Sequence, residues 1–466
     1  MGYFCGIVSG YMGAIADSRL ILIKGLVKSL PQSSLRSLEM ALGLTRDAPL
    51  VEVRELISAE LEIRHVKDAV FAPFLPLFQP RTDGLNAVEF ENWILNNVWS
   101  ALAAREPELH EEARHTLRAL RIDDPVPVVF FRLVTAAAVI CREHPEDVLP
   151  KSPTKSDRDE VAEFANYLDL HRILRSTLAR LPDYMGRVDA EKAAALRLMF
   201  KDACELSDEG GYRWLETLFA NLEDGSQIIK FVATVSDRPN DRFLAGSELA
   251  DFGERILDRI EEELRELKAS ATGRNKANAD LGSVGARVSQ SLAQLQSFEH
   301  YIELSRDGPW GKRAADAHKL IAELVEGQLK SAEKVLEEAL PMKSERIYGR
   351  MKKDVPHIDK PLKPEVIEKA RQILQFIRDI RGTASSGGYA SLHAKTMQAL
   401  ETMMDGYFEE LLGLANGEDA FDPDTCMAAF ETVTDLMEGL CGEEKAQVAR
   451  RRVASSDVFK PRNTAA

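Results

Sequence analysis

Cysteine is scarce in this sequence of 466 residues. The five cysteines are widely spaced, at Cys5, Cys141, Cys204, Cys426 and Cys441. Disulfide frameworks and zinc knuckles need closely spaced or regularly patterned cysteines, as in Cys-x-x-Cys. The spacing therefore argues against both and is typical of a protein in a reducing compartment, so we expect a cytoplasmic location.

Positive charge is also in the minority. Lysine and arginine number 60 against 75 acidic residues, which gives a formal net charge of −15. A protein that binds nucleic acid generally carries the opposite excess, so we expect no general nucleic-acid binding. Two stretches are locally basic: residues 342–364, with seven Lys or Arg against three acids, and Arg450–Arg452.

Long apolar runs are absent, although a membrane helix needs about 20 apolar residues in a row. The sequence therefore predicts no transmembrane segment. Residues 3–16 are uncharged, but no Lys or Arg precedes them as in a signal peptide. Gly2, Gly6 and Gly10 have the spacing that lets helices approach closely, which leaves two alternatives open. This segment is either a helix that associates peripherally with a membrane or with another copy of itself, or a leader with no role.

Common catalytic motifs are missing too. There is no GxxxxGK[ST] phosphate loop, no GxSxG nucleophile elbow and no HExxH metal motif. We therefore predict a non-enzymatic protein without a cofactor and without a metal site.

Helical periodicity dominates what is present. Apolar residues recur every three or four positions, the pattern of amphipathic helices. Three such stripes are Leu249, Phe252, Ile256, Ile260, Leu264 and Leu267; Val284, Val288, Leu292, Leu295, Phe298 and Ile302; and Ile321, Val325, Leu329, Ala332, Leu336 and Leu340. Only residues 228–235 have a strand-like composition, and their helical neighbours favour a buried helix. The predicted fold class is all-α, with several helical bundles.

Polar and glycine-bearing segments at residues 151–156 and 270–282 are the best linkers. They divide the chain into an N-terminal helical domain (residues 1–150), one bundle (157–270) and a second bundle (283–445). Residues 446–466 are predicted to be a flexible tail.

The two bundles resemble each other in sequence. A shift of 177 residues aligns Glu191-Lys192-Ala193 with Glu368-Lys369-Ala370, and Gly210-Gly211-Tyr212 with Gly387-Gly388-Tyr389, without a gap. Paired glycines permit positive φ and a sharp reversal between two helices. We therefore predict an internal duplication, in which residues 160–268 and 337–445 superpose helix for helix.

The second copy reads Ile377-Arg378-Asp379-Ile380-Arg381-Gly382-Thr383-Ala384, with Gly388 and Leu392 further on. This pattern resembles the signature of the histidine phosphotransfer (HPt) domain, His-x-Leu/Ile-Lys-Gly-Ser/Thr-Ala followed by a glycine and a leucine. HPt domains are four-helix bundles of bacterial phosphorelays and chemotaxis kinases. The resemblance covers about residues 365–440, and Glu401 falls near the acidic residue that some members place beside the histidine.

The position of the phospho-accepting histidine is occupied by Arg378, and by Lys201 in the first copy. A guanidinium stays protonated and has no free lone pair for attack, so phosphotransfer at this position is excluded under that alignment. His393 lies on the next helix and does not replace it. What remains is docking of a signalling partner, such as a receiver domain or a kinase. The predicted partner-binding residues are Arg378 and Arg381, one turn apart on a helix, and Lys201.

A second hypothesis concerns two Glu-x-x-His pairs, Glu62 with His65 and Glu112 with His115. Such pairs put a carboxylate and an imidazole on one helix face and, with two more glutamates, can bind two iron or manganese ions. Glu39 and Glu89 are expected on the intervening helices. The alternative function is therefore a di-metal carboxylate enzyme or metal-binding protein.

Overall fold

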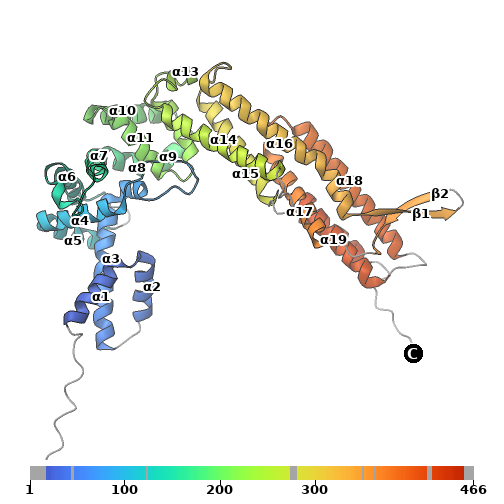
Figure 1. The fold of residues 1–466 in the computed structure, drawn as a ribbon, viewed down its shortest axis with the longest axis horizontal. Coiled ribbons are helices and arrows are strands. Elements are labelled where there is room, and N and C mark those ends of the chain that lie inside the picture. Colours follow the sequence, from blue (N-terminus) through green and yellow to red (C-terminus); the bar gives the residue numbers. More distant parts are fainter. Residues whose placement is uncertain are drawn as a thin grey trace, which may run out of the picture. The chain divides into compact units, whose positions relative to one another are not determined.

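The computed structural model describes residues 17–43, 47–121, 124–272, 281–348, 351–359, 363–416 and 422–455. The chain divides into two compact units, Met1–Ile228 and Ile229–Ala466. Figure 1 shows the elements of both units in sequence colours. The N-terminal segment with Gly2, Gly6 and Gly10 lies outside the described residues.

All regular secondary structure in the described part of the first unit is helical. Its α-helices are α1 (Asp17–Ser29), α2 (Gln32–Leu42), α3 (Ala48–Phe71), α4 (Asn92–Arg105), α5 (Pro107–Ala119), α6 (Val128–Glu143), α7 (Lys155–Asp169), α8 (His171–Ala179), α9 (Leu181–Met185), α10 (Ala190–Leu206) and α11 (Gly210–Asn221). Three 3₁₀ helices interrupt them, η1 (Ala72–Phe78), η2 (Pro145–Asp147) and η3 (Gly225–Gln227).

Aromatic rings form part of the core of this unit. Phe164 on α7 contacts Phe74, Phe78 and Phe90 with ring centroids 5.2–6.2 Å apart, all at steep interplanar angles. Edge-to-face packing of this kind adds about 0.5–1.5 kcal/mol per pair to the burial of the rings. The cluster joins α7 to η1 and to the segment that leads into α4.

The second unit begins with the short helices α12 (Ile228–Val235) and α13 (Asp241–Leu244) and continues with long ones. These are α14 (Ala250–Thr272), α15 (Leu281–Tyr301), α16 (Pro309–Ala339), α17 (Pro364–Asp379), α18 (Ala390–Ala415), α19 (Pro423–Cys441) and α20 (Glu443–Ala454). The 3₁₀ turn η4 (Arg381–Thr383) follows α17. Strands β1 (Met342–Tyr348) and β2 (Met351–Pro356) pair antiparallel between α16 and α17.

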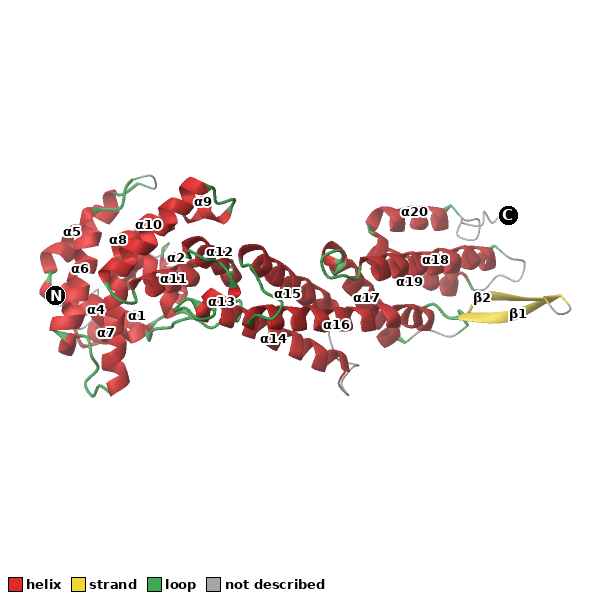
Figure 2. Ribbon diagram, turned by 90° about the horizontal axis from the view of Figure 1, so that it is seen from above, coloured by secondary structure: helices red, strands yellow, loops and turns green. Residues whose placement is uncertain are grey.

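The long helix α16 is shared by two helical bundles of this unit. It packs with α14 and α15 on one side and with α17 and α18 on the other, and α19 completes the second bundle against α17 and α18. Figure 2 shows the β1–β2 hairpin at the end of this unit. The Arg313 guanidinium on α16 bonds to Asp258 and Glu261 on α14, 2.6 Å from each. The bundle containing α16, α17, α18 and α19 holds the candidate site.

The all-α prediction is confirmed: the structure is 79% helical and has a two-stranded sheet. The three predicted stripes on α14, α15 and α16 are buried at every named position. Residues 228–235 form helix α12 rather than a strand. None of the described helices is both long enough and apolar enough to cross a bilayer.

The predicted tail is partly wrong, because residues 446–454 belong to helix α20. Ala446, Ala449 and Val453 recur at helical spacing and are buried, at 0%, 5% and 6% exposure. These small apolar residues stand in a charged segment, so their stripe is weak in the sequence. The remaining tail residues, 456–466, lie outside the described residues.

The predicted domain boundaries and the two compact units do not coincide, since the division at residue 228 falls inside the predicted bundle 157–270. Residues 151–154 only join η2 to α7, whose start is fixed by a capping box of Thr154 and Asp157. Helices α6 and α7 on either side of this loop pack against each other within the first unit. The loop is therefore an intradomain turn.

The helix-for-helix correspondence of the two copies fails at the hairpin. Strands β1 and β2 fall where the 177-residue shift places parts of helices α7 and α8. The two glycine pairs also act differently. Gly388 has φ +75°, whereas Gly210 and Gly211 begin α11, and a Cβ on Gly210 would lie 1.9 Å from the Ala203 carbonyl oxygen. The first pair therefore serves close packing, and only the second contains a residue with positive φ.

Candidate functional site

The predicted docking residues of the second unit lie at the C-terminal end of α17. Arg378 is in the last turn of the helix and is exposed. Its Nη2 atom donates a hydrogen bond to Oε1 of Gln375, 2.8 Å away. Nε2 of Gln375 in turn donates to Oδ1 of Asp379 at 2.6 Å. Gln375 thus stands between the guanidinium and the neighbouring carboxylate.

The last carbonyl groups of α17 have no partner within the helix and need one from elsewhere. Side chains from two neighbouring helices supply it. His393 on α18 donates from Nε2 to the Ile377 carbonyl oxygen at 2.8 Å, and Ser289 on α15 donates from Oγ to the Asp379 carbonyl oxygen at 3.0 Å. These bonds fix the end of the helix that carries Arg378.

The turn after α17 is held by Tyr389. Its hydroxyl lies 2.8 Å from Oγ1 of Thr383 and donates to the Ile380 carbonyl oxygen at 3.4 Å. The ring lies against Gly387, where a Cβ would approach Tyr389 Cε1 to 2.1 Å. Gly388 adopts φ +75°, which a residue with a side chain rarely does. Both glycines are therefore required by this turn.

Arg381 corrects one expectation. It does not share a helix with Arg378, because α17 ends at Asp379 and Arg381 begins the 3₁₀ turn η4. Both arginines are nevertheless exposed, Arg378 just before the last residue of α17 and Arg381 two residues after it. The cap residue Ile380 is fully buried and anchors the turn between them.

Arg378 also lines a shallow groove of about 460 Å³ between α17 and α19. Further along this groove Arg371 forms an ion pair with Asp435 at 2.7 Å. Arg378 and Arg381 form no ion pair with any described residue, whereas Arg371 is neutralised. We call Arg378 and Arg381, with the adjacent end of this groove, the docking face.

Lys201 lies on α10 in the first unit. Its side chain is 73% exposed, and its Nζ is 3.9 Å from Oε1 of Glu205, one turn away. Its role in partner binding stays a prediction, and the name docking face refers only to the two arginines of the second unit with their groove.

The structure does not support the di-metal hypothesis in the part of the chain that it describes. Glu62 accepts hydrogen bonds from Arg118, which hold the pKa of its carboxyl group below the ordinary value although burial opposes this shift. Glu112 forms an ion pair with Arg132 at 3.3 Å instead. Arginine thus occupies both carboxylates that were expected to bind metal.

The two further glutamates do not complete a site either. Glu39 on α2 accepts a hydrogen bond from Ser58, and Glu89 is exposed in the non-helical segment before α4. His65 and His115 are exposed. Over the described ranges, no three His, Cys, Asp or Glu side chains are grouped so that they could hold a metal ion. The expected four-helix arrangement of these residues was wrong, since residue 89 is not on a helix.

Sequence reasoning identified the two arginines but not the residues that position them. Ser289, Thr383 and Tyr389 carry no motif, and their contacts depend on how α15 and α18 pack against α17. The motif excludes His393 as a phosphate acceptor, and nothing in the sequence indicates its bond to the end of α17. Comparisons with family models, curated proteins and solved structures found no match to this chain.

Proposed function

We propose that this protein is a non-enzymatic adaptor that binds an acidic protein partner through the docking face. The observation that carries the proposal is that Arg378 and Arg381 are exposed and lack an acidic partner among the described residues. Of the other exposed arginines from α17 to α20, Arg371, Arg450 and Arg452 are paired with acids, and Arg451 at the far end of α20 is not. Two unpaired arginines on a fixed helix end can receive carboxylates from another protein.

The chemistry favours carboxylates over other groups. Each guanidinium offers a planar fork of donors that matches a carboxylate in a bidentate geometry. The bonds from His393 and Ser289 hold the helix end in place, so little order has to be gained on binding. A receiver domain or a kinase with an acidic surface fits this requirement, and the resemblance to HPt domains suggests that class of partner. The proposal places the complex in the cytoplasm.

The proposed adaptor does not transfer phosphate. Arg378 cannot accept a phosphoryl group, because its guanidinium has no free lone pair. The nearest imidazole along this helix end, His393, is only 6% exposed and its Nε2 is bonded to the Ile377 carbonyl oxygen. Incubation with a radiolabelled phosphodonor and an active kinase should leave this chain unlabelled, and label on His393 would refute this part of the proposal.

Site-specific photocrosslinking in the native host tests the docking face. A benzoylphenylalanine in place of Ser385, exposed in the turn beside Arg381, should capture one dominant protein. The matched control is the same substitution at Lys369, which is exposed on α17 nine residues, and therefore half a helical circuit, from Arg378. Equal capture from both positions, or none from Ser385, would contradict the proposal.

A further inference from the structure

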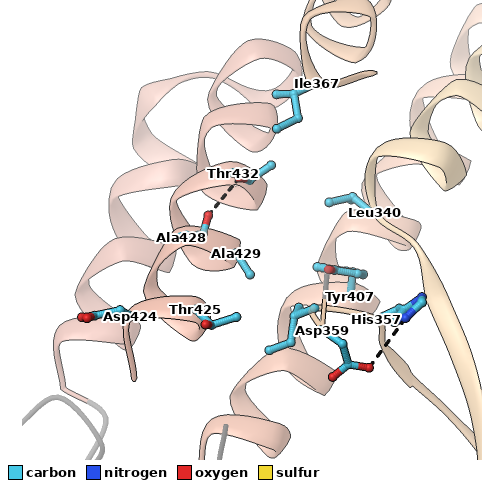
Figure 3. Close-up of a pocket in the computed structure, with 11 residues that line it drawn as sticks. Leu340, His357, Asp359, Ile367, Tyr407, Asp424, Thr425, Ala428, Ala429 and Thr432 are labelled. Atoms are coloured by element: carbon cyan, nitrogen blue, oxygen red, sulfur yellow. Dashed lines mark hydrogen bonds and ion pairs between the residues drawn. The ribbon is translucent and has the colours of Figure 1, made fainter. Parts of the chain in front are cut away.

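A second concave site lies in the same bundle, away from the helix end that carries Arg378. It is a pocket of about 510 Å³ where α17 and α19 begin and α16 ends. Figure 3 shows its wall on α19 facing Leu340, His357 and Asp359, with Tyr407 of α18 on the same side as these three residues. Pockets of this size hold small organic molecules.

Small side chains on α19 leave this space open. Thr425, Ala428, Ala429 and Thr432 line the pocket along the first turns of the helix. Phe430, Val433, Met437 and Leu440 lie on a different face of the same helix and are buried. The cavity therefore follows the small-residue face of α19 and does not reflect a loose bundle core. Leu340, Ile358 and Ile367 provide the rest of the apolar lining.

One polar atom in the pocket has no partner. Tyr407 as a whole residue is only 5% exposed, and its hydroxyl forms no hydrogen bond with any described residue. The hydroxyl oxygen is not sealed in the core but opens onto the pocket, where water satisfies it until a ligand acceptor replaces that water. In contrast, the other two pocket hydroxyls are used, since Thr432 bonds to the Ala428 carbonyl oxygen and Thr425 to Asp422.

The charges at the pocket are acidic or already neutralised. Asp359 lies 2.7 Å from the Lys343 ammonium and 3.6 Å from Nε2 of His357. Asp424, in the first turn of α19, forms no ion pair with a described residue. The Asp424 carboxylate would repel an anionic ligand, and no free cation of the described lining would offset this repulsion. A neutral ligand would not be repelled.

We propose that this pocket binds a compact, mostly apolar, uncharged molecule with a hydrogen-bond acceptor, such as a carbonyl oxygen, to which the Tyr407 hydroxyl donates a hydrogen bond. The apolar walls bury the body of the ligand, and Tyr407 fixes its orientation. Burial raises the pKa of Tyr407 to about 12, so the hydroxyl remains a donor at neutral pH. This binding does not depend on the docking face.

Fluorescence titration of the full chain with prodan tests the site. Prodan is an uncharged naphthalene with one carbonyl acceptor, and its emission moves to longer wavelength when that carbonyl accepts a hydrogen bond. We expect saturable binding to the unaltered protein. Tyr407→Phe should weaken binding about 5-fold, the effect of one neutral hydrogen bond, and shift the bound emission to shorter wavelength.

Two further variants separate filling of the pocket from general effects. Ala429→Leu should abolish binding because the added methyl groups occupy the cavity, while Ala394→Leu, at an exposed position of α18 outside the pocket, should leave it unchanged. Thermal unfolding checks that both variants fold. If Ala429→Leu does not fold, the emission shift in Tyr407→Phe decides the test. No saturable binding, or an unaltered bound emission in Tyr407→Phe, would overturn the proposal.

Competition tests the charge preference. N-phenyl-1-naphthylamine and its 8-sulfonate have the same rings and differ in the sulfonate, which adds one negative charge and three acceptor oxygens. The uncharged compound should displace prodan at least 10-fold more effectively. Equal or better displacement by the sulfonate would refute the uncharged ligand class.

Discussion

His393 on α18 donates a hydrogen bond from Nε2 to the carbonyl oxygen of Ile377, 2.8 Å away on α17. Ile377 directly precedes Arg378, so this bond connects the packing of the bundle to the position of the docking face. His393 is 6% exposed, and water therefore cannot replace it easily as a donor. The imidazole acts here as a structural cap of the preceding helix.

Replacement of His393 by leucine should lower the free energy of unfolding by about 1–3 kcal/mol, because the Ile377 carbonyl loses its partner. Urea denaturation measures this change. His115→Leu is the matched control, since His115 is exposed on α5, and it should change stability by less than about 0.5 kcal/mol. An equal effect of both substitutions would show that the bond contributes nothing.

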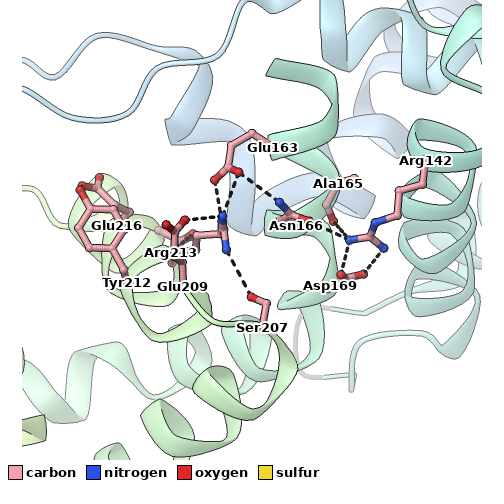
Figure 4. A network of polar contacts seen from close by, with 11 residues as sticks. Arg142, Glu163, Ala165, Asn166, Asp169, Ser207, Glu209, Tyr212, Arg213 and Glu216 are labelled. Carbon is pink, nitrogen blue, oxygen red and sulfur yellow. Dashed lines mark hydrogen bonds and ion pairs between the residues drawn. The ribbon is translucent and has the colours of Figure 1, made fainter. Parts of the chain in front are cut away.

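Two arginines of the first unit, Arg213 and Arg142, should contribute unequally to the free energy of unfolding (Figure 4). The Arg213 side chain is 8% exposed and bonds to Glu163 at 2.6 and 3.0 Å and to Glu209 at 2.7 Å. The Arg142 side chain, bonded to Asp169 at 3.0 Å, is 41% exposed. We expect Arg213→Ala to cost about 2–4 kcal/mol and Arg142→Ala less than about 1 kcal/mol.

Urea unfolding of these two variants gives the comparison. The two carboxylates are equally exposed, at 39% for Glu163 and 38% for Asp169, so the difference arises from the arginines themselves. Removal of the buried Arg213 side chain loses packing where α7 meets α11, whereas water can take the place of the exposed Arg142 side chain. Similar losses in both variants would contradict this ranking.

Loss of the hydroxyl should lower the stability of the protein at one of two buried tyrosines, Tyr389 before α18, and not at the other, Tyr407 on α18. Tyr389→Phe removes bonds to Thr383 and to the Ile380 carbonyl oxygen and should cost about 1 kcal/mol. Tyr407→Phe removes no bond to a described residue and should leave stability unchanged or slightly higher. Thermal unfolding without added ligand measures both, and a loss in Tyr407→Phe as large as in Tyr389→Phe would contradict the open hydroxyl.

Asp83 should make the first unit sensitive to acid. Burial opposes its charge, but hydrogen bonds from Arg81 and from the backbone N–H of Gly225, at 2.9 Å, outweigh this effect and lower the pKa from its ordinary value of 3.8. A lowered pKa in the folded state means that the stabilisation is present above about pH 4 and is lost as the pH falls through the folded-state pKa.

Asp83→Asn should therefore cost about 1–3 kcal/mol at pH 7, and the difference from the unaltered protein should shrink as the pH falls below about 4. Unfolding in urea across this range tests it. A difference that does not depend on pH would show that the charge of Asp83 is not the cause.

The sequence was sufficient for elements whose apolar residues recur regularly. The stripe from Leu249 to Leu267 is buried along α14, and the start of α3 follows Asp47 and Pro49 as their types predict. Local signals determine such helices, because each turn buries the same face. The fold class could therefore be predicted without a structure.

The hairpin β1–β2 could not be predicted in this way. Its residues from Met342 to Pro356 are mostly polar and basic and lack the alternation of a half-buried strand. Its pairing also joins residues such as Lys343 and Val355, which are distant in the chain. The pocket next to it depends on the same pairing, since His357 donates its backbone N–H to the Pro341 carbonyl oxygen.

The candidate site was partly predictable for a similar reason. The sequence predicts which arginines lie near a helix end and are exposed, and Arg378 was predicted in this way. Whether a cation is paired depends on packing, as Arg371 and Arg378 on the same helix demonstrate. Only three-dimensional proximity neutralises the first and leaves the second free to bind.

The affinity of the crosslinked partner for charge-reversed chains tests the docking face most directly. With purified proteins, Arg378→Glu combined with Arg381→Glu should weaken binding at least 10-fold, and less so at high salt. Lys369→Glu combined with Lys395→Glu changes the net charge equally at exposed positions elsewhere and should weaken it less than about 2-fold. Equal effects of the two double variants, or an unchanged affinity after reversal of both arginines, would contradict the account.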